Sequence, residues 1–431
     1  MEIVLLFGIL VFLMSISVPI GIALGLSTLL TMVLTSDIPV IMITQNAFTA
    51  LDSFPLMAII FFIMAGNLMS TGGISRRIIE FCNVLVGKTV GALGTITIAA
   101  CAFFAAISGS GPATVSAIGA MMIPEMKKSG YSPSYAASLT CAGGIIGVII
   151  PPSIPFVIYG VITGASIGEL FLAGFLPGFL IAGVLIAINM RISQKRRYGL
   201  KQVENSVFEN KSLLKTFMNS FWALLTPVII LGGIYAGIFT PTESAVVAIF
   251  YALFASKFIY HELTMKMVVD SIKDSVITNA ICLFTIGLSL AFASYLTMQQ
   301  IPMKVAGLIL GLTSSPIVIL LLINLFLLIV GCFIDNISSM TILTPILYPI
   351  VVNTCGVDPI HFGIFMTVNL AIGFITPPYG ANLFVATGVT GLKIEEITTE
   401  IMPFLIGLFI CLMLITYVPA ISMMLPNFFY H

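Results

Sequence analysis

The stretch GVIIPPSIPFVIYG, residues 147–160, lies within an apolar segment long enough for one membrane-spanning helix, but Pro151, Pro152 and Ser153 interrupt it near its middle. Proline removes a backbone donor and clashes with the preceding turn, so we expect the helix to break here. Backbone groups freed inside a bilayer cannot face lipid. They must meet protein, water or a ligand, and the break is therefore a candidate binding site.

The overall composition is typical of a membrane protein. Of the 431 residues, 59% are hydrophobic and 8% are charged. A soluble protein of this length could not bury so much apolar surface. The formal net charge of +0 gives no indication of a nucleic-acid partner. The seven cysteines include no CxxC pair and mostly lie in apolar stretches, so we expect neither a disulfide framework nor a thiolate metal site.

We therefore predict an all-α polytopic membrane protein. Several segments exceed the roughly 20 residues needed to cross a bilayer. The N-terminal stretch MEIVLLFGILVFLM lacks a basic region and a cleavage pattern, so we expect a retained span. The candidate spans are 3–34 (one tilted helix or two short ones), 55–70, 90–108, 113–126, 135–165, 170–190, 222–239, 242–257, 276–298, 316–334, 337–352, 360–390 and 401–425.

The basic residues predict the topology. Segment 191–219 is rich in Lys and Arg, so the positive-inside rule places it in the cytoplasm. We hypothesise that 90–108 with 113–126, and 316–334 with 337–352, form two re-entrant hairpins that enter from opposite sides. All of the 17 Lys and Arg residues except Lys304 then lie inside. This pattern leaves the side of the N-terminus open.

The chain also repeats itself. Pro-Pro occurs at 151–152 and at 377–378, an offset of 226 residues. The same offset relates the pairs Gly147 and Gly373, Ile149 and Ile375, Glu169 and Glu395, and Pro177 and Pro403. Two polar breaks, ISGSGPATVS at 107–116 and FIDNISSMTI at 333–342, also align within a residue or two. We infer two homologous halves, about 50–180 and 277–407.

Flanking charge indicates that the two halves are inverted. Lys127 and Lys128 follow the first polar break, whereas VVNTCGVD, without a basic residue, follows the second. Two broken helices and two hairpin tips related by such symmetry can converge near the membrane midplane. Exposed carbonyls there suit a bare cation, and half-helix N-termini suit an anion. We therefore expect a joint site for substrate and ion.

The first tip, Ser108–Pro112, has two interpretations. In the first interpretation, the tip is a simple connection between two helices, because glycine and proline favour turns. In the other, its carbonyls and hydroxyls bind Na⁺, because hard cations prefer oxygen ligands.

The second tip contains Asp335 and Asn336. Asp335 is the only acidic residue from 275 to 357, and a carboxylate within a span is a functional hypothesis by default. We expect it to bind or neutralise a cation, with Ser338, Ser339 and Thr341 as supporting polar groups; the alternative is a loop aspartate that reaches water.

Three further motifs are the polar residues at the helix breaks, TPTES and GKT. Ser153 and Thr376 lie at the helix breaks, where satisfying freed backbone and contacting a ligand are equally open roles. TPTES at 240–244 predicts a capping box, with Thr240 as N-cap, Pro241 at N1 and Glu243 at N3. GKT at 87–89 resembles the end of a phosphate loop, but Cys82 stands where that loop needs its first glycine, so we expect no use of ATP.

Four motifs in order carry a family resemblance. SGSGPATVSAIG, GGIIGVIIPPSIPFVIYG, GIFTPTESAVVA and GFITPPYGANLF resemble the hallmarks of the large membrane subunit of tripartite ATP-independent periplasmic (TRAP) transporters. The resemblance implies an elevator-type fold with two hairpins and two unwound helices. It also implies a bacterial inner-membrane location and Na⁺-driven uptake of an organic acid anion, such as a C4-dicarboxylate or sialic acid. The implied partners are a small four-helix membrane subunit, expected here as a separate polypeptide, and a periplasmic substrate-binding protein.

The resemblance also assigns site residues. The substrate-binding candidates are Ser108, Ser110, Ser153, Asp335 and Asn336. The candidate Na⁺ ligands are Ser108, Ser110, Gly111, Gly147, Pro151, Asp335, Asn336, Ser338, Gly373, Thr376 and Pro378. The expected organisation is 1–50, N-terminal scaffold; 51–190, first repeat, with a hairpin at about 90–126 and a broken helix at about 135–165; 191–275, basic loop, two connecting spans and an amphipathic segment; 276–425, second repeat, with a hairpin at about 316–352 and a broken helix at about 360–390; and 426–431, tail.

Two other classes of protein compete with a transporter that works with a binding protein. A stand-alone sodium/anion symporter or an ion channel could share the inverted repeat, although closed hairpins suit alternating access better than an open pore. An intramembrane enzyme would need a nucleophile–base pair or a metal set. The three histidines, at 261, 361 and 431, have no metal-ligand spacing, so we expect no enzyme.

Overall fold

The computed structural model describes residues 2–16, 18–35, 38–86, 91–198, 213–313, 315–377 and 380–430, and these residues are almost entirely helical. Eight of the described helical segments are long and apolar enough to cross a membrane. The all-α polytopic fold is thereby confirmed. The elements are α1 (Glu2–Ser15), α2 (Ile20–Thr35), α3 (Ile41–Leu51), η1 (Phe54–Leu56), α4 (Met57–Thr71), α5 (Ile74–Val86), α6 (Ala92–Ser108), α7 (Gly111–Lys128), α8 (Pro133–Gly144), η2 (Ile145–Val148), α9 (Ile154–Thr163), α10 (Ile167–Arg196), α11 (Leu213–Tyr235), α12 (Pro241–Phe254), η3 (Ala255–Ile259), α13 (Met265–Met298), α14 (Ile301–Leu312), α15 (Pro316–Phe333), α16 (Asn336–Tyr348), η4 (Pro349–Thr354), α17 (Pro359–Gly373), α18 (Ala381–Thr390), α19 (Ile394–Tyr417) and α20 (Ala420–Tyr430).

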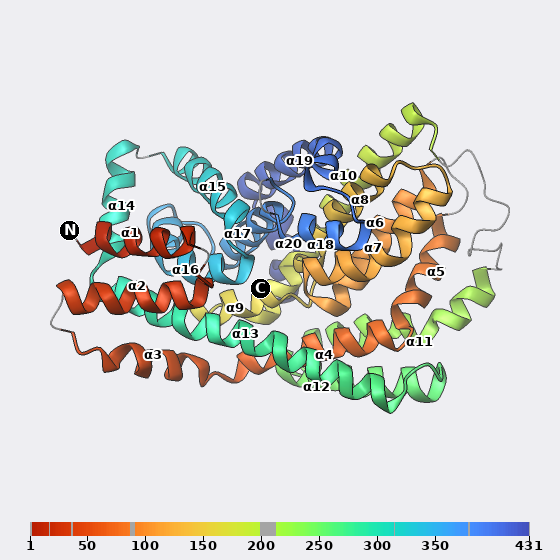
Figure 1. Cartoon of the computed structure of the whole chain (residues 1–431), viewed down its shortest axis with the longest axis horizontal. Coiled ribbons are helices and arrows are strands. Elements are labelled where there is room, and N and C mark those ends of the chain that lie inside the picture. Colours follow the sequence, from red (N-terminus) through yellow and green to blue (C-terminus); the bar gives the residue numbers. More distant parts are fainter. Residues whose placement is uncertain are drawn as a thin grey trace.

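The helices form two groups that lie side by side (Figure 1). The first is built along α13, which packs against α2, α3 and α4, while α12 packs on α4 and on α11. The second contains the two hairpins, α6–α7 and α15–α16, together with α8, α10, α17 and α19. Helix α5 joins the groups, because it contacts α11 on one side and α6 on the other.

The internal repeat reappears as matching helices. Adding 226 to Pro133, where α8 begins, gives 359, where α17 begins. The same addition places α6 on α15, α7 on α16 with η4, and α9 on α18 to within two residues at their first residues. It also places α5 on α14, a pair that was not among the expected spans. Both are short, and α5 is strongly amphipathic, so neither has the uniform apolar run on which the spans were chosen.

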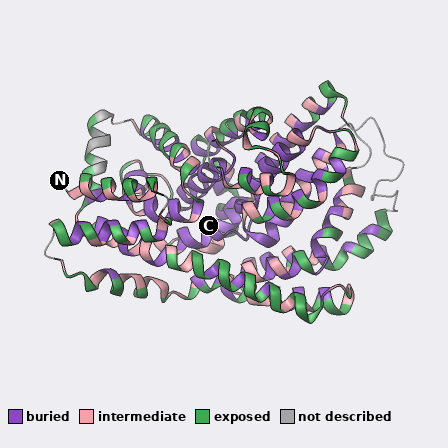
Figure 2. Ribbon diagram, in the orientation of Figure 1, coloured by how far each residue is buried: buried purple, intermediate pink, exposed green. Residues whose placement is uncertain are grey.

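The first halves of the two broken helices form the buried centre of the second group (Figure 2). In α8 every residue from Tyr135 to Gly144 is buried, and in α17 every residue from Ile360 to Gly373 is buried. A helix that is buried all round has no lipid-facing stripe. These two segments are therefore surrounded by protein, as broken membrane helices must be.

Several expected boundaries were wrong. The expected span 276–298 begins earlier, at Met265, because the basic segment before it continues the same helix. The expected span 401–425 ends at Tyr417, because Pro419 follows and proline restricts the residue before it. Helix α20 then covers most of the expected tail 426–431. Segment 41–51, assigned to no span, is the helix α3.

The capping box at the start of α12 is confirmed. The Thr240 hydroxyl accepts the Glu243 N–H, and a Glu243 carboxylate oxygen accepts the Thr240 N–H at 2.8 Å. Each residue satisfies a backbone donor of the other, which starts the helix at Pro241.

In each repeat, buried hydrogen bonds join the first half of the broken helix to the last helix, and we call each set a polar joint. The two polar joints lie at corresponding positions of the two repeats. In the first, the Asn189 side chain at the end of α10 accepts from the Tyr135 hydroxyl (3.0 Å) and donates to Gly91 O (3.0 Å) and Thr95 Oγ1 (3.1 Å). Adding 226 to 135 gives His361, whose Nε2 lies 3.1 Å from Thr416 O at the end of α19. Each joint ties the first half of a broken helix to the last helix of its repeat.

We predict that Asn189→Leu lowers the free energy of unfolding by about 1–3 kcal/mol, because it leaves the buried Gly91 carbonyl and Tyr135 hydroxyl without that partner. Thermal or denaturant unfolding of the purified protein measures the change. Asn427→Leu, at an exposed position of α20, is the control. Equal stability of the Asn189 variant and the wild type would show that the joint does not hold α8.

Candidate functional site

The first hairpin tip is a tight turn held inside the protein. Helix α6 ends at Ser108 and α7 begins at Gly111, and Gly109 between them has a φ of 60°, which favours glycine. The Ser110 hydroxyl accepts the Ala113 N–H as the N-cap of α7. Ser108 is 5% exposed. The tip is therefore surrounded by protein, and it presents oxygen atoms there.

Those oxygen atoms form a compact cluster. The Thr114 hydroxyl donates to Ser110 O at 2.8 Å and lies 3.1 Å from the Ser108 hydroxyl. Gly147 packs against the same cluster, since a Cβ on it would lie 2.5 Å from Thr114 Oγ1 and 2.7 Å from Ser110 O. The cluster thus contains the oxygens of two hydroxyls and a carbonyl, and it lies beside η2, which ends at Val148. These are the ligand atoms that a hard cation prefers.

The first break is packed onto this tip. The Ile154 N–H donates to Gly109 O at 3.4 Å, and every residue from 145 to 160 is buried. Ser153 is fully buried and N-caps α9. Its hydroxyl donates to Val148 O at 2.6 Å. This geometry matches the backbone-satisfying role of Ser153, and its contact with a ligand stays a prediction. Pro151, the first proline of the break, is also buried.

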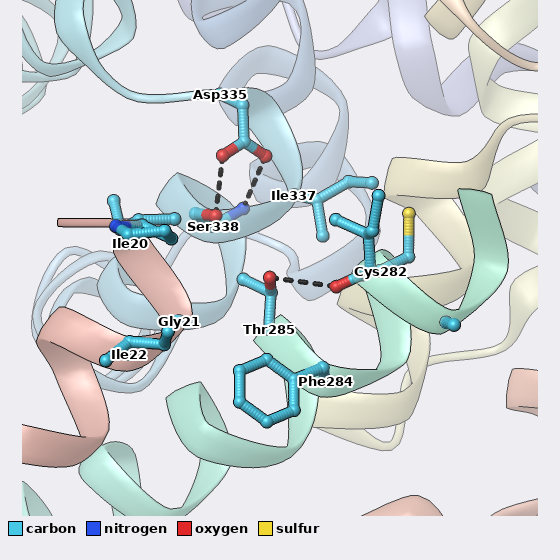
Figure 3. Close-up of a pocket in the computed structure, with 12 residues that line it drawn as sticks. Ile20, Gly21, Ile22, Cys282, Phe284, Thr285, Asp335, Ile337 and Ser338 are labelled. Carbon is cyan, nitrogen blue, oxygen red and sulfur yellow. Dashed lines mark hydrogen bonds between the residues drawn. The ribbon is translucent and has the colours of Figure 1, made fainter. Parts of the chain in front are cut away.

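The second tip is capped by its own carboxylate. Asp335 is the N-cap of α16 and accepts both the Ser338 N–H (3.0 Å) and the Ser338 hydroxyl (2.6 Å), as Figure 3 shows. The next residue, Asn336, is 2% exposed, and neither its Oδ1 nor its Nδ2 has a hydrogen-bond partner. A buried amide with both ends unpaired is costly. Among the described residues of this tip, Asn336 therefore keeps unused hydrogen-bonding capacity for a polar ligand.

The second break lies against the helix that leads to this tip. Gly373 touches Gly331 of α15 so closely that a Cβ on Gly373 would collide with the Gly331 backbone. The Thr376 hydroxyl donates to Ile372 O at 2.8 Å, a carbonyl that also accepts the Ile375 N–H at 3.1 Å. The candidate ligand Pro378 lies outside the described residues.

The two breaks meet at Gly111. A Cβ on Gly111 would lie 3.1 Å from the Phe374 ring, 3.2 Å from Asn382 Oδ1 and 3.2 Å from Gly144 O. Asn382 also donates to Cys141 O at 3.1 Å, and it is fully buried with its Oδ1 unpaired. Helix α16 of the second hairpin packs against α9, which follows the first break. Each hairpin therefore contacts the broken helix of the other repeat.

Asp335 also borders a cavity between the two groups of helices. The cavity has a volume of about 580 Å³ and lies between the start of α2, the middle of α13 and the second tip (Figure 3). Its lining includes Gly21, Cys282 and Thr285 besides Asp335 and Ser338. Asp335 is exposed at this cavity, whereas Ser108 of the first tip packs against Gly66 of α4.

Three residues of the site were not among the candidates. Thr114 lies one turn beyond the first tip, in the motif SGSGPATVSAIG. Its hydroxyl could not be placed at the tip without the geometry of the turn. Asn382 lies in the last quoted motif, and Gly331 carries no signal beyond being a glycine. Gly331 and Asn382 act through contacts between segments far apart in the chain, whereas the hydrogen bonds of Thr114 are local to the turn.

Comparison with known proteins identifies relatives along the whole chain. The family model for the tripartite ATP-independent periplasmic transporter, DctM component, matches residues 7–421. The isethionate TRAP transporter permease protein DctMQ of Oleidesulfovibrio alaskensis is 46% identical over 97% of this chain, which spans 65% of that protein's length. The C4-dicarboxylate TRAP transporter large permease protein DctM of Rhodobacter capsulatus is 38% identical over 99% of both chains.

Two further relatives extend this picture. The sialic acid TRAP transporter permease protein SiaT of Haemophilus influenzae is 39% identical over 96% of this chain and 66% of its own. Among solved structures, the Alcanivorax borkumensis YdaH transporter, described as having an unusual topology, matches with a TM-score of 0.65 at 15% identity, over 87% of this chain and 86% of that one. This last match supports the fold alone.

If the first tip binds Na⁺, as the sequence predicts, Gly147→Ala should separate the first break from that tip and weaken Na⁺ binding about tenfold, the factor expected when one charge-assisted contact is lost. The measurement is the rise in unfolding temperature when choline is replaced by Na⁺, because a ligand of the native state stabilises it. Gly388→Ala is the matched control, since nothing lies within 4 Å of its Cβ position. An unchanged Na⁺ response of the Gly147 variant would remove this glycine from the site.

Proposed function

This chain belongs to the DctM component family of tripartite ATP-independent periplasmic transporters, and from that premise we propose that it is the permease that imports a small organic acid anion with Na⁺ as the coupling ion. The observation that carries the proposal is that the first hairpin tip contacts both broken helices, at Gly109 and Gly111, while the buried amides of Asn336 at the second tip and of Asn382 are left incompletely paired.

The substrate class follows from the electrostatics of the site. No Lys or Arg occurs in 91–126, in 129–190 or in 305–392, the segments that build the tips and breaks. Positive potential must therefore come from the N-termini of α7, α9, α16 and α18, and from bound Na⁺. Relatives are named for isethionate, C4-dicarboxylate and sialic acid, which are all organic acid anions. A C4-dicarboxylate, sialic acid or a similar acid is the substrate that we propose.

Sodium coupling is proposed from the donor atoms. The first tip offers the hydroxyls of Ser108 and Thr114 and the carbonyl of Ser110, and the second offers the Asp335 carboxylate and the Asn336 amide. Hydroxyl, carbonyl and carboxylate oxygens suit a hard cation such as Na⁺. A cation bound there adds positive charge for the anion, so the binding of each favours the other.

An elevator-type motion is proposed from the two groups of helices. The second group carries both tips and both breaks, and the pseudo-symmetric helices α5 and α14 connect it to the first. We propose that the second group moves as one body across the membrane while the first stays fixed. The protein is in this view a transporter in the bacterial inner membrane, without ATP and without enzymatic activity.

The proposed partners are those of the family. A small membrane subunit would form a complex with this chain, and a periplasmic substrate-binding protein would deliver the acid. The alternative is a stand-alone sodium/anion symporter or a channel, for which the inverted repeat alone would be sufficient.

Uptake of labelled acid anions into proteoliposomes tests the proposal. Saturable uptake that needs both an inward Na⁺ gradient and the binding protein supports it. Saturable uptake without the binding protein supports a stand-alone symporter, and flux without saturation supports a channel.

We predict that Asp335→Asn weakens the Na⁺ dependence of uptake while the protein stays folded. Asparagine is a good N-cap and keeps an acceptor for the Ser338 N–H, so α16 still begins correctly, but the negative charge is lost. Initial rates measured against Na⁺ concentration should show a half-saturation shift of about tenfold. An unchanged Na⁺ response would exclude Asp335 from cation binding.

We predict that Ser153→Leu abolishes uptake, because the larger side chain fills the break and leaves Val148 O without its hydroxyl donor. Ser153→Ala, which loses the cap but adds no volume, is the matched variant and should keep substantial uptake, at a stability cost of about 1 kcal/mol. Normal uptake by the leucine variant would show that the break needs no free space.

A further inference from the structure

A second, polar pocket lies away from the hairpins, where three elements meet. It has a volume of about 450 Å³ and is formed by α5, the start of α11 and the end of η3. The residues that line it are Arg76, Arg77, Glu80, Met218, Asn219, Trp222, Ile259, Tyr260 and Glu262. Two guanidinium groups and two carboxylates therefore share one pocket with the only tryptophan of the chain.

The pocket lies at a membrane boundary. The candidate span Leu213–Tyr235 begins beside the pocket, and the candidate span Pro241–Ile259 ends beside it. Tryptophan and tyrosine are enriched at the level of lipid headgroups, where Trp222 and Tyr260 are found here. Phe258, which precedes the lining residue Ile259, is 63% exposed, and Met218 in the lining is 64% exposed, as expected for side chains that touch lipid. By the positive-inside rule, this is the cytoplasmic boundary.

One of the two arginines is fully engaged by the protein. Arg77 donates to Glu262 Oε1 (2.8 Å) and Gly73 O (2.9 Å), and its guanidinium carbon lies 3.6 Å above the centre of the Tyr260 ring. Arg77 therefore builds the pocket wall and fastens the start of α5 to the segment that links α12 and α13.

The other arginine is available to a ligand. The Arg76 Nε lies 3.3 Å from Glu80 Oε1, and the side chain is 60% exposed. A guanidinium carries five N–H donors, so its terminal nitrogens can still donate. The Tyr260 hydroxyl accepts the Ala223 N–H at 2.9 Å, which leaves its own proton to donate. Glu262, 37% exposed, keeps carboxylate lone pairs for a donor on the ligand.

We propose that this pocket binds the phosphoethanolamine headgroup of a membrane lipid. The phosphate is held by Arg76 and the Tyr260 hydroxyl, and the ammonium group by Glu262. The acyl chains lie along the exposed apolar side chains that continue down α11, from Phe221 to Val228. A headgroup with both charges matches a pocket in which two cations face two carboxylates.

The charges distinguish this ligand from other common headgroups. An anionic phosphatidylglycerol has no ammonium group, so the remaining lone pairs of Glu262 would gain no donor and would face added negative charge. A choline headgroup has no N–H to donate to Glu262, so it would lose the hydrogen bonds that an ammonium makes to a carboxylate. Because α5 continues toward the first hairpin, a lipid bound at its start would also brace the helix that joins the two groups.

The test uses the full chain, purified and stripped of lipid, with dioleoyl lipids that differ only in headgroup. Native mass spectrometry measures one-to-one adducts with phosphatidylethanolamine, phosphatidylcholine and phosphatidylglycerol. We expect phosphatidylethanolamine to bind about tenfold more tightly than the other two, and Arg76→Ala to remove that preference. Arg191→Ala, at another exposed basic position, is the control and should keep it. Soluble phosphoethanolamine is offered separately.

Each other outcome would overturn the proposal. Equal binding of phosphatidylcholine would exclude recognition of the ammonium, and tighter binding of phosphatidylglycerol would show a simple anion site. A preference that persists in Arg76→Ala would place the lipid elsewhere. Soluble phosphoethanolamine that binds as tightly as the lipid would show that the ligand is a small molecule and that the acyl chains contribute nothing.

Discussion

The structure depends on one constraint, that every backbone group freed within a membrane must find a partner inside the protein. At the first break, Val148 O is satisfied by the Ser153 hydroxyl, and at the second, Ile372 O accepts both the Ile375 N–H and the Thr376 hydroxyl. The first break is buried throughout, and the second is buried as far as Ile375, by helices of its own and of the other repeat. The energetic cost of breaking a helix in this environment explains why α8 and α17 are buried over nearly their whole lengths. Only a protein shell on all sides makes such breaks tolerable.

The helices of the two inverted repeats bury the breaks of both halves, but the two halves are not equivalent. Adding 226 to Gly109 of the first tip gives Asp335 of the second, so a glycine without a side chain corresponds to a carboxylate. The first tip packs closely against Gly66 of α4, whereas the second borders a cavity of about 580 Å³ beside α2 and α13. The joints differ as well, since Tyr135 corresponds to His361. Symmetry therefore determines the architecture, and the departures from it give the two tips different chemistry.

Sequence reasoning reached the fold because its signals are periodic or strictly local. Two Pro-Pro pairs in register with two polar tips predicted the halves, and the capping box at Thr240 was placed to the residue. Helices α5 and α14 were missed because one face of α5 is charged and both are too short to cross a membrane alone. The roles of Ser108, Gly147 and Gly373 as ligands stay predictions, and the structure places Ser108 and Gly147 beside the same oxygen cluster and Gly373 against α15. Gly331 and Asn382 could not be found, because their importance arises from contacts across long stretches of chain, whereas Thr114 needed the exact geometry of the turn at the first tip.

The absence of basic residues from the segments that form the tips and breaks has a consequence for coupling. A site that held its anion with arginine would bind the anion whether or not sodium were present. Here the fixed positive potential comes from helix N-termini, each equivalent to about half a charge, and the negative Asp335 opposes it at the second tip. In the mechanism proposed above, a bare anion would therefore be held weakly, and a cation that neutralised Asp335 would remove the opposition and add attraction. Reciprocity would then require that the anion also favour the cation, so that neither would be bound well alone. A carrier that moves only when both ligands are bound does not dissipate the Na⁺ gradient without importing the anion. In the proposed mechanism, the weak fixed positive charge of the site is what makes the binding of each ligand depend on the other.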